Sequence, residues 1–70
     1  MNHTLSKTIL IARVIDLIAE KYKLSLQDAR NDLYSSELID LIDNDESGLY
    51  GESPLFVFSL YEKEKTRNKQ

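Results

Sequence analysis

Residues 5–22 read LSKTILIARVIDLIAEKY, and this segment sets the fold class. Its apolar side chains recur with the spacing i, i+3, i+4, i+7, which is one face of an α-helix. They are Ile11, Val14, Ile15, Ile18 and Tyr22. Leu10 and Leu17 add a second apolar line beside the first. A helix this apolar lies at the centre of its fold or is buried against another molecule.

Downstream of this helix, a second and a third helix are predicted from capping signals. Ser25 followed by Asp28 resembles a capping box, so we expect a short helix over 25–34. Its apolar positions Leu26, Ala29 and Leu33 share one face.

Ser36 offers a fresh N-cap for a third helix over 37–43, ELIDLID. There we expect Leu38, Leu41 and Ile42 to point inward. The acids that follow, Asp43 and Asp45, stand at its C-terminus, where the helix dipole disfavours negative charge. Such a local inconsistency can indicate a functional site.

The last segment, 54–65, carries conflicting signals. Phe56, Val57, Phe58 and Tyr61 favour a strand by propensity, whereas Ser53-Pro54 is a typical helix start. We expect a helix, with a strand as the alternative. A helix buries most of the aromatics, with one line of side chains and a second beside it: Leu55, Phe58 and Glu62, and then Val57, Leu60 and Tyr61. The prediction is a small all-α domain over residues 1–65, a bundle of three to four short helices, followed by a disordered tail over 66–70.

The composition limits what so small a chain can do. It has 70 residues, no cysteine and a net charge of −3. One core of this size only marginally offsets chain entropy, and neither disulfides nor thiolate metal sites can support it. An oligomer, most simply a dimer, or a partner chain is the expected support. No signal peptide and no membrane span are recognisable, so a cytoplasmic location is expected.

Charge is distributed unevenly along the chain. Residues 37–62 contain seven acids and no Lys or Arg, and residues 63–70 contain four bases and one acid. Phosphate contacts supply most of the affinity for nucleic acids, so an acidic middle argues against a nucleic-acid ligand.

The loop DNDESGLYGESP, residues 43–54, begins like an EF-hand calcium loop. With Asp43 at loop position 1, Asp45, Ser47 and Gly48 occupy positions 3, 5 and 6. Position 12 requires a bidentate Glu but is Pro54, which has no ligand atom. We therefore predict no metal site but an acidic loop between helices.

Signals for catalysis are lacking. His3 is the only histidine, and it stands near the N-terminus without a partner in the pattern, so no base can activate a serine. The chain has two glycines and no phosphate-binding loop. We predict no catalytic residue, no cofactor and no small-molecule substrate.

Aromatic and apolar residues in the acidic loop indicate a protein contact instead. A loop rarely needs both Leu49 and Tyr50 unless they fold back or dock elsewhere. Aromatics are enriched at interface centres, and acids select a basic partner surface. The predicted partner-binding residues are Asp43, Asp45, Glu46, Leu49, Tyr50 and Phe56.

The order of the segments resembles an uncharacterised family of short bacterial helical proteins, which are often encoded beside toxin-like ADP-ribosyltransferases. The similarity rests on EKYKLS at the end of the first helix, on QDARNDL followed by ELIDLI, and on LYG in the loop. The resemblance implies a binding role, as an antitoxin-like or accessory partner, with no catalytic residues.

The predicted function is therefore a non-catalytic protein–protein interaction module. Two alternatives stay open. One is a small DNA-associated regulator of helix-turn-helix type, with 37–43 as its recognition helix, although that helix carries three acids and no base. The other is a homo-oligomeric structural module.

Overall fold

The computed structural model describes residues 4–67. Four α-helices follow one another, and two single 3-10 turns occupy the loop before the last. They are α1 (Thr4–Tyr22), α2 (Leu26–Tyr34), α3 (Leu38–Asp43), η1 (Asp45–Ser47), η2 (Leu49–Gly51) and α4 (Pro54–Arg67). No strand occurs among these residues, so the all-α prediction is confirmed.

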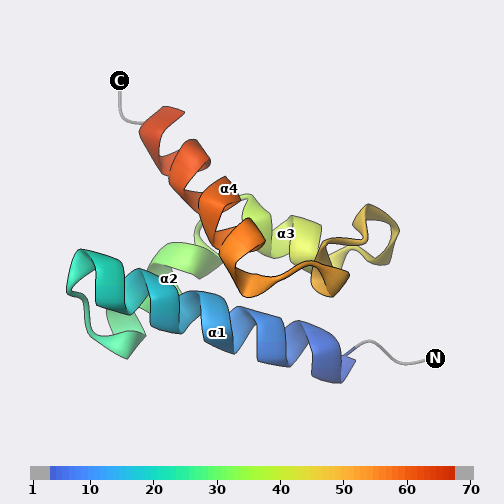
Figure 1. Ribbon diagram of the computed structural model, residues 1–70, viewed down its shortest axis with the longest axis horizontal. Coiled ribbons are helices and arrows are strands. Elements are labelled where there is room, and N and C mark those ends of the chain that lie inside the picture. Colours follow the sequence, from blue (N-terminus) through green and yellow to red (C-terminus); the bar gives the residue numbers. More distant parts are fainter. Residues whose placement is uncertain (1–3, 68–70) are drawn as a thin grey trace.

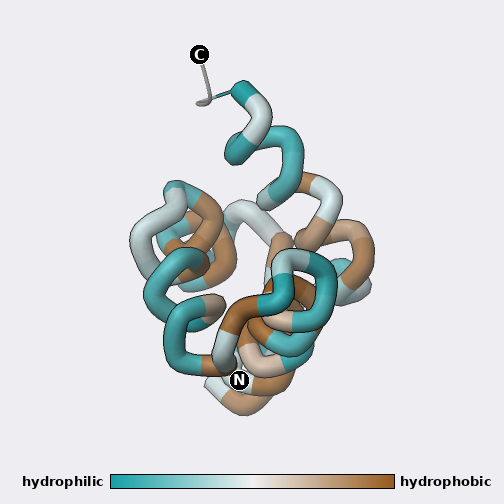
Figure 2. The backbone as a smooth tube through the Cα atoms, turned by 90° about the vertical axis from the view of Figure 1, so that its left-hand side faces the viewer, coloured by the Kyte–Doolittle hydropathy of each residue, from teal (hydrophilic) through white to brown (hydrophobic). Residues whose placement is uncertain are grey.

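Helix α1 is the element on which the others assemble. It packs against α2 on one side and α4 on another, and η2 closes over its N-terminal half. In Figure 1, α4 begins beside the middle of α1 and rises from it at an angle, and α3 lies beside α4. The last turns of α4 extend beyond the other helices, and Figure 2 shows that this end is hydrophilic.

The core draws on every α-helix and on η2. Val14 and Ile18 of α1 are fully buried, as the helical spacing predicted. Ile11, Ile15 and Tyr22 flank them as half-buried residues. The buried set is Leu10, Val14, Ile18, Ala19, Ala29, Leu33, Leu38, Ile42, Leu49, Val57 and Tyr61.

Local signals explain where α1 ends and α2 begins. Lys23 takes a left-handed conformation with φ of 57°, and the Leu24 N–H donates to the Ala19 carbonyl at 3.0 Å. This is a Schellman-type end, in which a left-handed residue reverses the chain. The Ser25 hydroxyl then accepts from the Asp28 N–H at 3.1 Å, which confirms the predicted cap.

Helix α4 settles the ambiguity of the last segment. The Ser53 hydroxyl accepts from the Phe56 N–H at 3.1 Å, so this cap starts a helix at Pro54 and the strand alternative is wrong. The helix runs to Arg67, and Thr66 is therefore helical rather than part of a tail. The rest of the predicted tail, 68–70, and His3 lie outside the described residues. Within 4–67, no helix is long and apolar enough to cross a membrane.

Leu41, which was predicted to point inward, is exposed, as are Leu26 and Leu55, which were placed on apolar lines of their helices. Leu26, Leu41 and Leu55 have exposed fractions of 60%, 45% and 67%. Leu26 and Leu41 stand on helices of nine and six residues, and Leu55 stands in the first turn of α4, on the side away from buried Val57. These side chains remain as apolar surface.

Candidate protein-interaction surfaces

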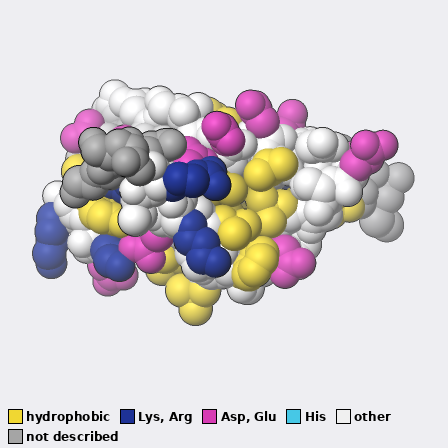
Figure 3. Space-filling view, turned by 90° about the horizontal axis from the view of Figure 1, so that it is seen from above, with side chains coloured by type: hydrophobic (Ala, Val, Ile, Leu, Met, Phe, Trp, Pro, Cys, Tyr) yellow, Lys and Arg dark blue, Asp and Glu magenta, His cyan; other side chains and the backbone are white. Residues whose placement is uncertain are grey.

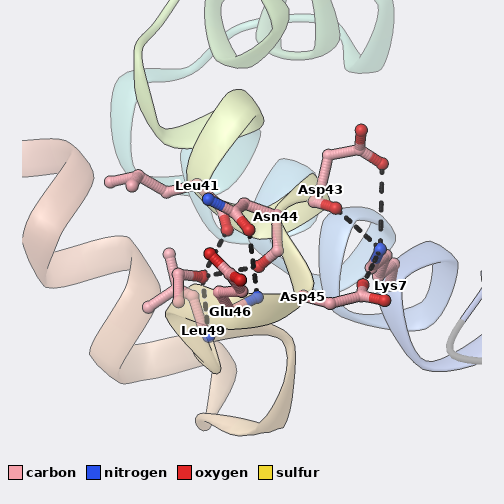
Figure 4. A network of polar contacts seen from close by, with 8 residues as sticks. Lys7, Leu41, Asp43, Asn44, Asp45, Glu46 and Leu49 are labelled. Atoms are coloured by element: carbon pink, nitrogen blue, oxygen red, sulfur yellow. Dashed lines mark hydrogen bonds and ion pairs between the residues drawn. The ribbon is translucent and has the colours of Figure 1, made fainter.

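Two acids of the predicted site contact a lysine near the start of α1, Lys7. The Lys7 ammonium donates to the Asp43 backbone carbonyl at 2.7 Å and lies 2.5 Å from an Asp45 carboxylate oxygen. A carboxylate oxygen of Asp43 lies 3.9 Å away (Figure 4). The hydrogen bond to Asp45 raises the pKa of Lys7 above its ordinary value. Negative charge at the end of α3 is thus compensated by a cation on α1.

The other predicted contact residues differ in how deeply they are buried. Leu49 is only 7% exposed and belongs to the core, where it lies between α3 and α1. Tyr50 is half-buried, with the Lys7 ammonium 5.9 Å from its ring centre. Glu46 and Phe56 are exposed. The six residues therefore do not form one continuous patch, because Leu49 leaves the surface.

The acidic loop is held by its own side chains. The Ser47 hydroxyl donates to the Leu41 carbonyl, and its oxygen accepts from the Leu49 N–H at 3.1 Å (Figure 4). Gly48 has φ of 69°, a left-handed value that few other residues adopt readily. These contacts turn the chain so that Leu49 folds back into the core. Among residues 4–67, no group of three or more His, Cys, Asp or Glu could hold a metal ion.

A second polar network joins α2 and α4. The Tyr61 hydroxyl donates to an Asp32 carboxylate oxygen at 2.8 Å, and the Lys65 ammonium lies 3.2 Å from the same oxygen. The Tyr61 hydrogen bond, followed by that of Lys65, lowers the pKa of Asp32. Burial, followed by the hydrogen bond to Asp32, raises the pKa of Tyr61.

A parallel network joins α1 and α4. The Tyr22 hydroxyl donates to Glu62 at 3.0 Å, and the Lys21 ammonium lies 2.6 Å from the same carboxylate oxygen. Lys21 is the main cause that lowers the pKa of Glu62, and burial raises the pKa of Tyr22. Both tyrosine hydroxyls donate hydrogen bonds to carboxylates, and their raised pKa values favour the neutral phenol.

Outside these networks, apolar side chains remain on the surface. Figure 3 shows hydrophobic side chains gathered toward the middle of one face, bordered by acidic and basic ones. Seven large hydrophobic residues among 4–67 are at least 45% exposed. Two grooves beside α1 account for four of them, and each groove has its own pattern of charge.

The α1–α4 groove consists of two adjoining hollows of about 440 and 270 Å³. Both hollows are bordered by Arg13 and Pro54, so they adjoin along α1. Its apolar side chains include Ile9, 47% exposed, and Leu55, 67% exposed. The complete lining is Ser6, Ile9, Leu10, Arg13, Asp16, Leu17, Glu20, Tyr50, Glu52, Ser53, Pro54 and Leu55.

The α1–α2 groove lies on the other side of α1 and has a volume of about 660 Å³. Leu26 and Tyr34, 60% and 49% exposed, provide most of its apolar border. It is lined by Ala12, Ile15, Asp16, Leu26, Gln27, Arg30, Asn31 and Tyr34. Asp16 belongs to both linings, so it stands on the ridge of α1 between the two grooves.

Sequence reasoning found Tyr50 but missed the rest of the α1–α4 groove. A signal for Leu55 was available, because it lies two positions before Val57 and so about 200° around the helix from that buried residue. No local signal pointed to Lys7, whose partners are 36 or more positions away.

No protein-family model, no curated protein and no solved structure matches this chain. We therefore infer its function from the surfaces described above.

Proposed function

We propose that this chain is a non-catalytic protein-interaction module that binds a helix of a partner protein in the α1–α4 groove. The observation that carries the proposal is the combination of exposed Ile9 and Leu55 with an acidic border in two adjoining hollows. Exposed apolar side chains rimmed by polar ones are typical of protein-interaction sites.

The dimensions of the groove suit a helix. Its lining runs along α1 from Ser6 to Glu20, and 14 steps of helical rise correspond to about 21 Å, nearly four turns. An amphipathic helix that lies in such a groove uses anchors at i, i+3, i+4 and i+7. Leu55 and Ile9 would contact those anchors, and half-buried Leu17 would form part of the floor.

The charge of the border selects the kind of partner. Asp16, Glu20 and Glu52 stand against a single base, Arg13, so the border carries three negative charges and one positive. A partner helix with Lys or Arg beside its apolar face complements this border. Such complementarity speeds encounter and discriminates between partners more than it tightens the complex.

This proposal keeps part of the predicted contact patch and relocates its apolar anchor. Tyr50 lines the groove, whereas Leu49 is replaced by Leu55 and Ile9. Following the resemblance to proteins encoded beside toxin-like enzymes, we suggest an antitoxin-like or accessory role. In this proposal the module acts in the cytoplasm, a reducing compartment that the lack of cysteine fits.

The DNA-binding alternative receives less support from the charges. The α2–turn–α3 arrangement would present α3 to the major groove, and the exposed charged residues of α3 are Asp40 and Asp43. Acids at these positions repel phosphates.

The test combines copurification with matched variants. The full chain is recovered from its native host at physiological salt, and the mass of the eluted species is measured by light scattering. We expect a companion protein in fixed stoichiometry. Leu55→Glu should remove the companion, because it places an acid at the apolar anchor, whereas Leu26→Glu on the opposite groove should retain it.

A defined probe tests the partner chemistry directly. Two synthetic helical peptides share one leucine face, and one carries lysines on its flanks while the other carries glutamates. Titration calorimetry should show binding of the basic peptide at least about tenfold tighter at low salt, with the difference shrinking as salt is added. Equal binding of both peptides, or full retention of the companion by Leu55→Glu, would overturn the proposal.

A further inference from the structure

The α1–α2 groove differs from the α1–α4 groove in its balance of charge. Its two walls carry one acid and one base, Asp16 on α1 and Arg30 on α2, with the amides of Gln27 and Asn31 between the apolar residues. Among residues 4–67, neither Asp16 nor Arg30 forms an ion pair. The groove therefore presents both signs of charge, and neither charge is neutralised by an ion pair within the described residues.

The apolar border of this groove combines a protrusion with a hollow. Leu26 is the first residue of α2, directly after the Ser25 cap, and its side chain is 60% exposed. The hollow beside it has a volume of about 660 Å³ and is bordered by Ile15 and Tyr34. The hollow is large enough to hold a leucine side chain. Leu26 itself stands on the rim of the hollow, where its side chain is exposed.

The same residues form a surface that is complementary to itself. In a two-fold dimer each copy offers the same patch, so that patch must hold both a protrusion and a hollow, and both charges. Here Leu26 can enter the hollow of a second copy while the second copy's Leu26 enters the first. If Asp16 of each copy is set opposite Arg30 of the other, the two-fold axis makes this ion pair occur twice.

The geometry points to a second copy of this chain as the occupant of the α1–α2 groove, in a symmetric dimer. The Arg30 guanidinium is already held over the Tyr34 ring at 5.5 Å, which orders it at the rim. The α1–α4 groove does not suit self-association in this way, because its excess of acids would face the same acids across a two-fold axis. The balance of charge thus favours a second copy of the chain in the α1–α2 groove and a different protein in the α1–α4 groove.

A dimer would also enlarge the small hydrophobic core of this chain. A chain of 70 residues without cysteine has little core to oppose its entropy, and burying Leu26 and Tyr34 adds apolar contact without a longer chain. The inference does not rest on the proposed function, although Asp16 lines both grooves. The variants that separate the two are therefore Leu26→Glu and Leu55→Glu, each of which changes one groove only.

Sedimentation equilibrium of the full chain tests the inference. The dimer has twice the monomer mass of 8.1 kDa, that is 16.2 kDa. Leu26→Glu should weaken dimerisation by roughly 30-fold or more, since it removes a central apolar contact from each copy. Leu55→Glu, an equally exposed leucine in the other groove, is the matched control and should dimerise like the native chain.

A charge exchange identifies the face. Asp16→Arg alone sets two bases against each other in both pairs, and Arg30→Asp alone sets two acids against each other, so each variant should be largely monomeric. Mixed in equal amounts, the two variants restore opposite charges in both pairs and should form a dimer that contains one copy of each. Circular dichroism checks that the exposed substitutions preserve the helical content.

The outcomes separate this inference from the proposed function. A native chain that stays at 8.1 kDa at high concentration overturns the dimer and leaves partner binding unaffected. A dimer that survives Leu26→Glu and both charge variants unchanged overturns this face. If the native chain forms the dimer but copurifies with no companion protein, or if Leu55→Glu retains the companion, the result counts against the α1–α4 groove alone.

Discussion

Leu49 is the residue that joins the acidic loop to the hydrophobic core. It follows Gly48, whose left-handed backbone turns the chain, and its N–H is bound by the Ser47 hydroxyl. Only 7% of Leu49 is exposed, so its energetic role is packing between α3 and α1. Phe56, which was predicted to share its contact role, is 47% exposed on α4.

Leu49→Ala should therefore destabilise the folded chain by about 3 kcal/mol, since it removes buried methyl groups and leaves a cavity. Urea denaturation followed by circular dichroism measures the change. Phe56→Ala is the comparison variant and should shift stability by less than about 1 kcal/mol, because its side chain is already half in water. Equal effects of the two substitutions would mean that Leu49 does not belong to the core.

At the scale of elements, the acidic loop is fastened to the start of α1 rather than presented freely. Lys7 reaches the Asp43 carbonyl and the Asp45 carboxylate, and its side chain is only 17% exposed. The link supplies positive charge at the C-terminus of α3, where the helix dipole favours a cation. Helix α1 and the loop are thereby held together at one end of the molecule.

Lys7→Met keeps most of the apolar stem and removes the charge. We expect faster amide hydrogen exchange across η1 and η2, because the loop loses its tie to α1, with little change in the middle of α1. Lys63→Met is the matched control, since Lys63 is exposed on α4 and forms no ion pair within residues 4–67. Unchanged exchange in the loop after Lys7→Met would show that Ser47 and Gly48 hold it without the lysine.

Across the whole molecule, α4 is joined to α1 and α2 by two tyrosine–carboxylate–lysine networks. Tyr61 and Lys65 lower the pKa of Asp32, and Lys21 and Tyr22 lower the pKa of Glu62. A carboxylate whose pKa is lowered by folding binds protons more weakly in the folded state than in the unfolded state. Its stabilising contribution is present above the unfolded pKa and is lost as pH falls through the folded pKa.

Stability should therefore decrease as pH falls below about 4.5, the ordinary pKa of Glu62, and continue to decrease below 3.8, that of Asp32. Urea midpoints measured between neutral pH and pH 3 would show this slope. The double variant Asp32→Asn, Glu62→Gln should be less stable at neutral pH and should show a flatter dependence in acid. An unchanged slope in the double variant would assign acid sensitivity to other carboxylates.

Much of the fold was predictable because its signals act within a single turn of helix. Ser25 and Ser53 cap the helices that follow them, and the spacing of Val14 and Ile18 marks the buried face of α1. These signals predicted the all-α class and the positions of α1, α2 and α4. The N-cap predicted at Ser36 is wrong by one position, because α3 follows Glu37, which has no side-chain cap bond. The local signals also failed for Leu26 and Leu55, whose burial depends on whether a neighbouring helix reaches them.

The candidate site was predictable only in its chemical character. The acidic loop and Tyr50 were recognised from the chain, but the grooves arise where α2 and the start of α4 lie beside α1. Residues as distant as Ile9 and Leu55 meet there, and Lys7 meets Asp43 across 36 positions. Caps and periodicity are local properties of the chain, whereas a groove or a compensating charge exists only once helices pack, because it is made by side chains that no local interaction brings together.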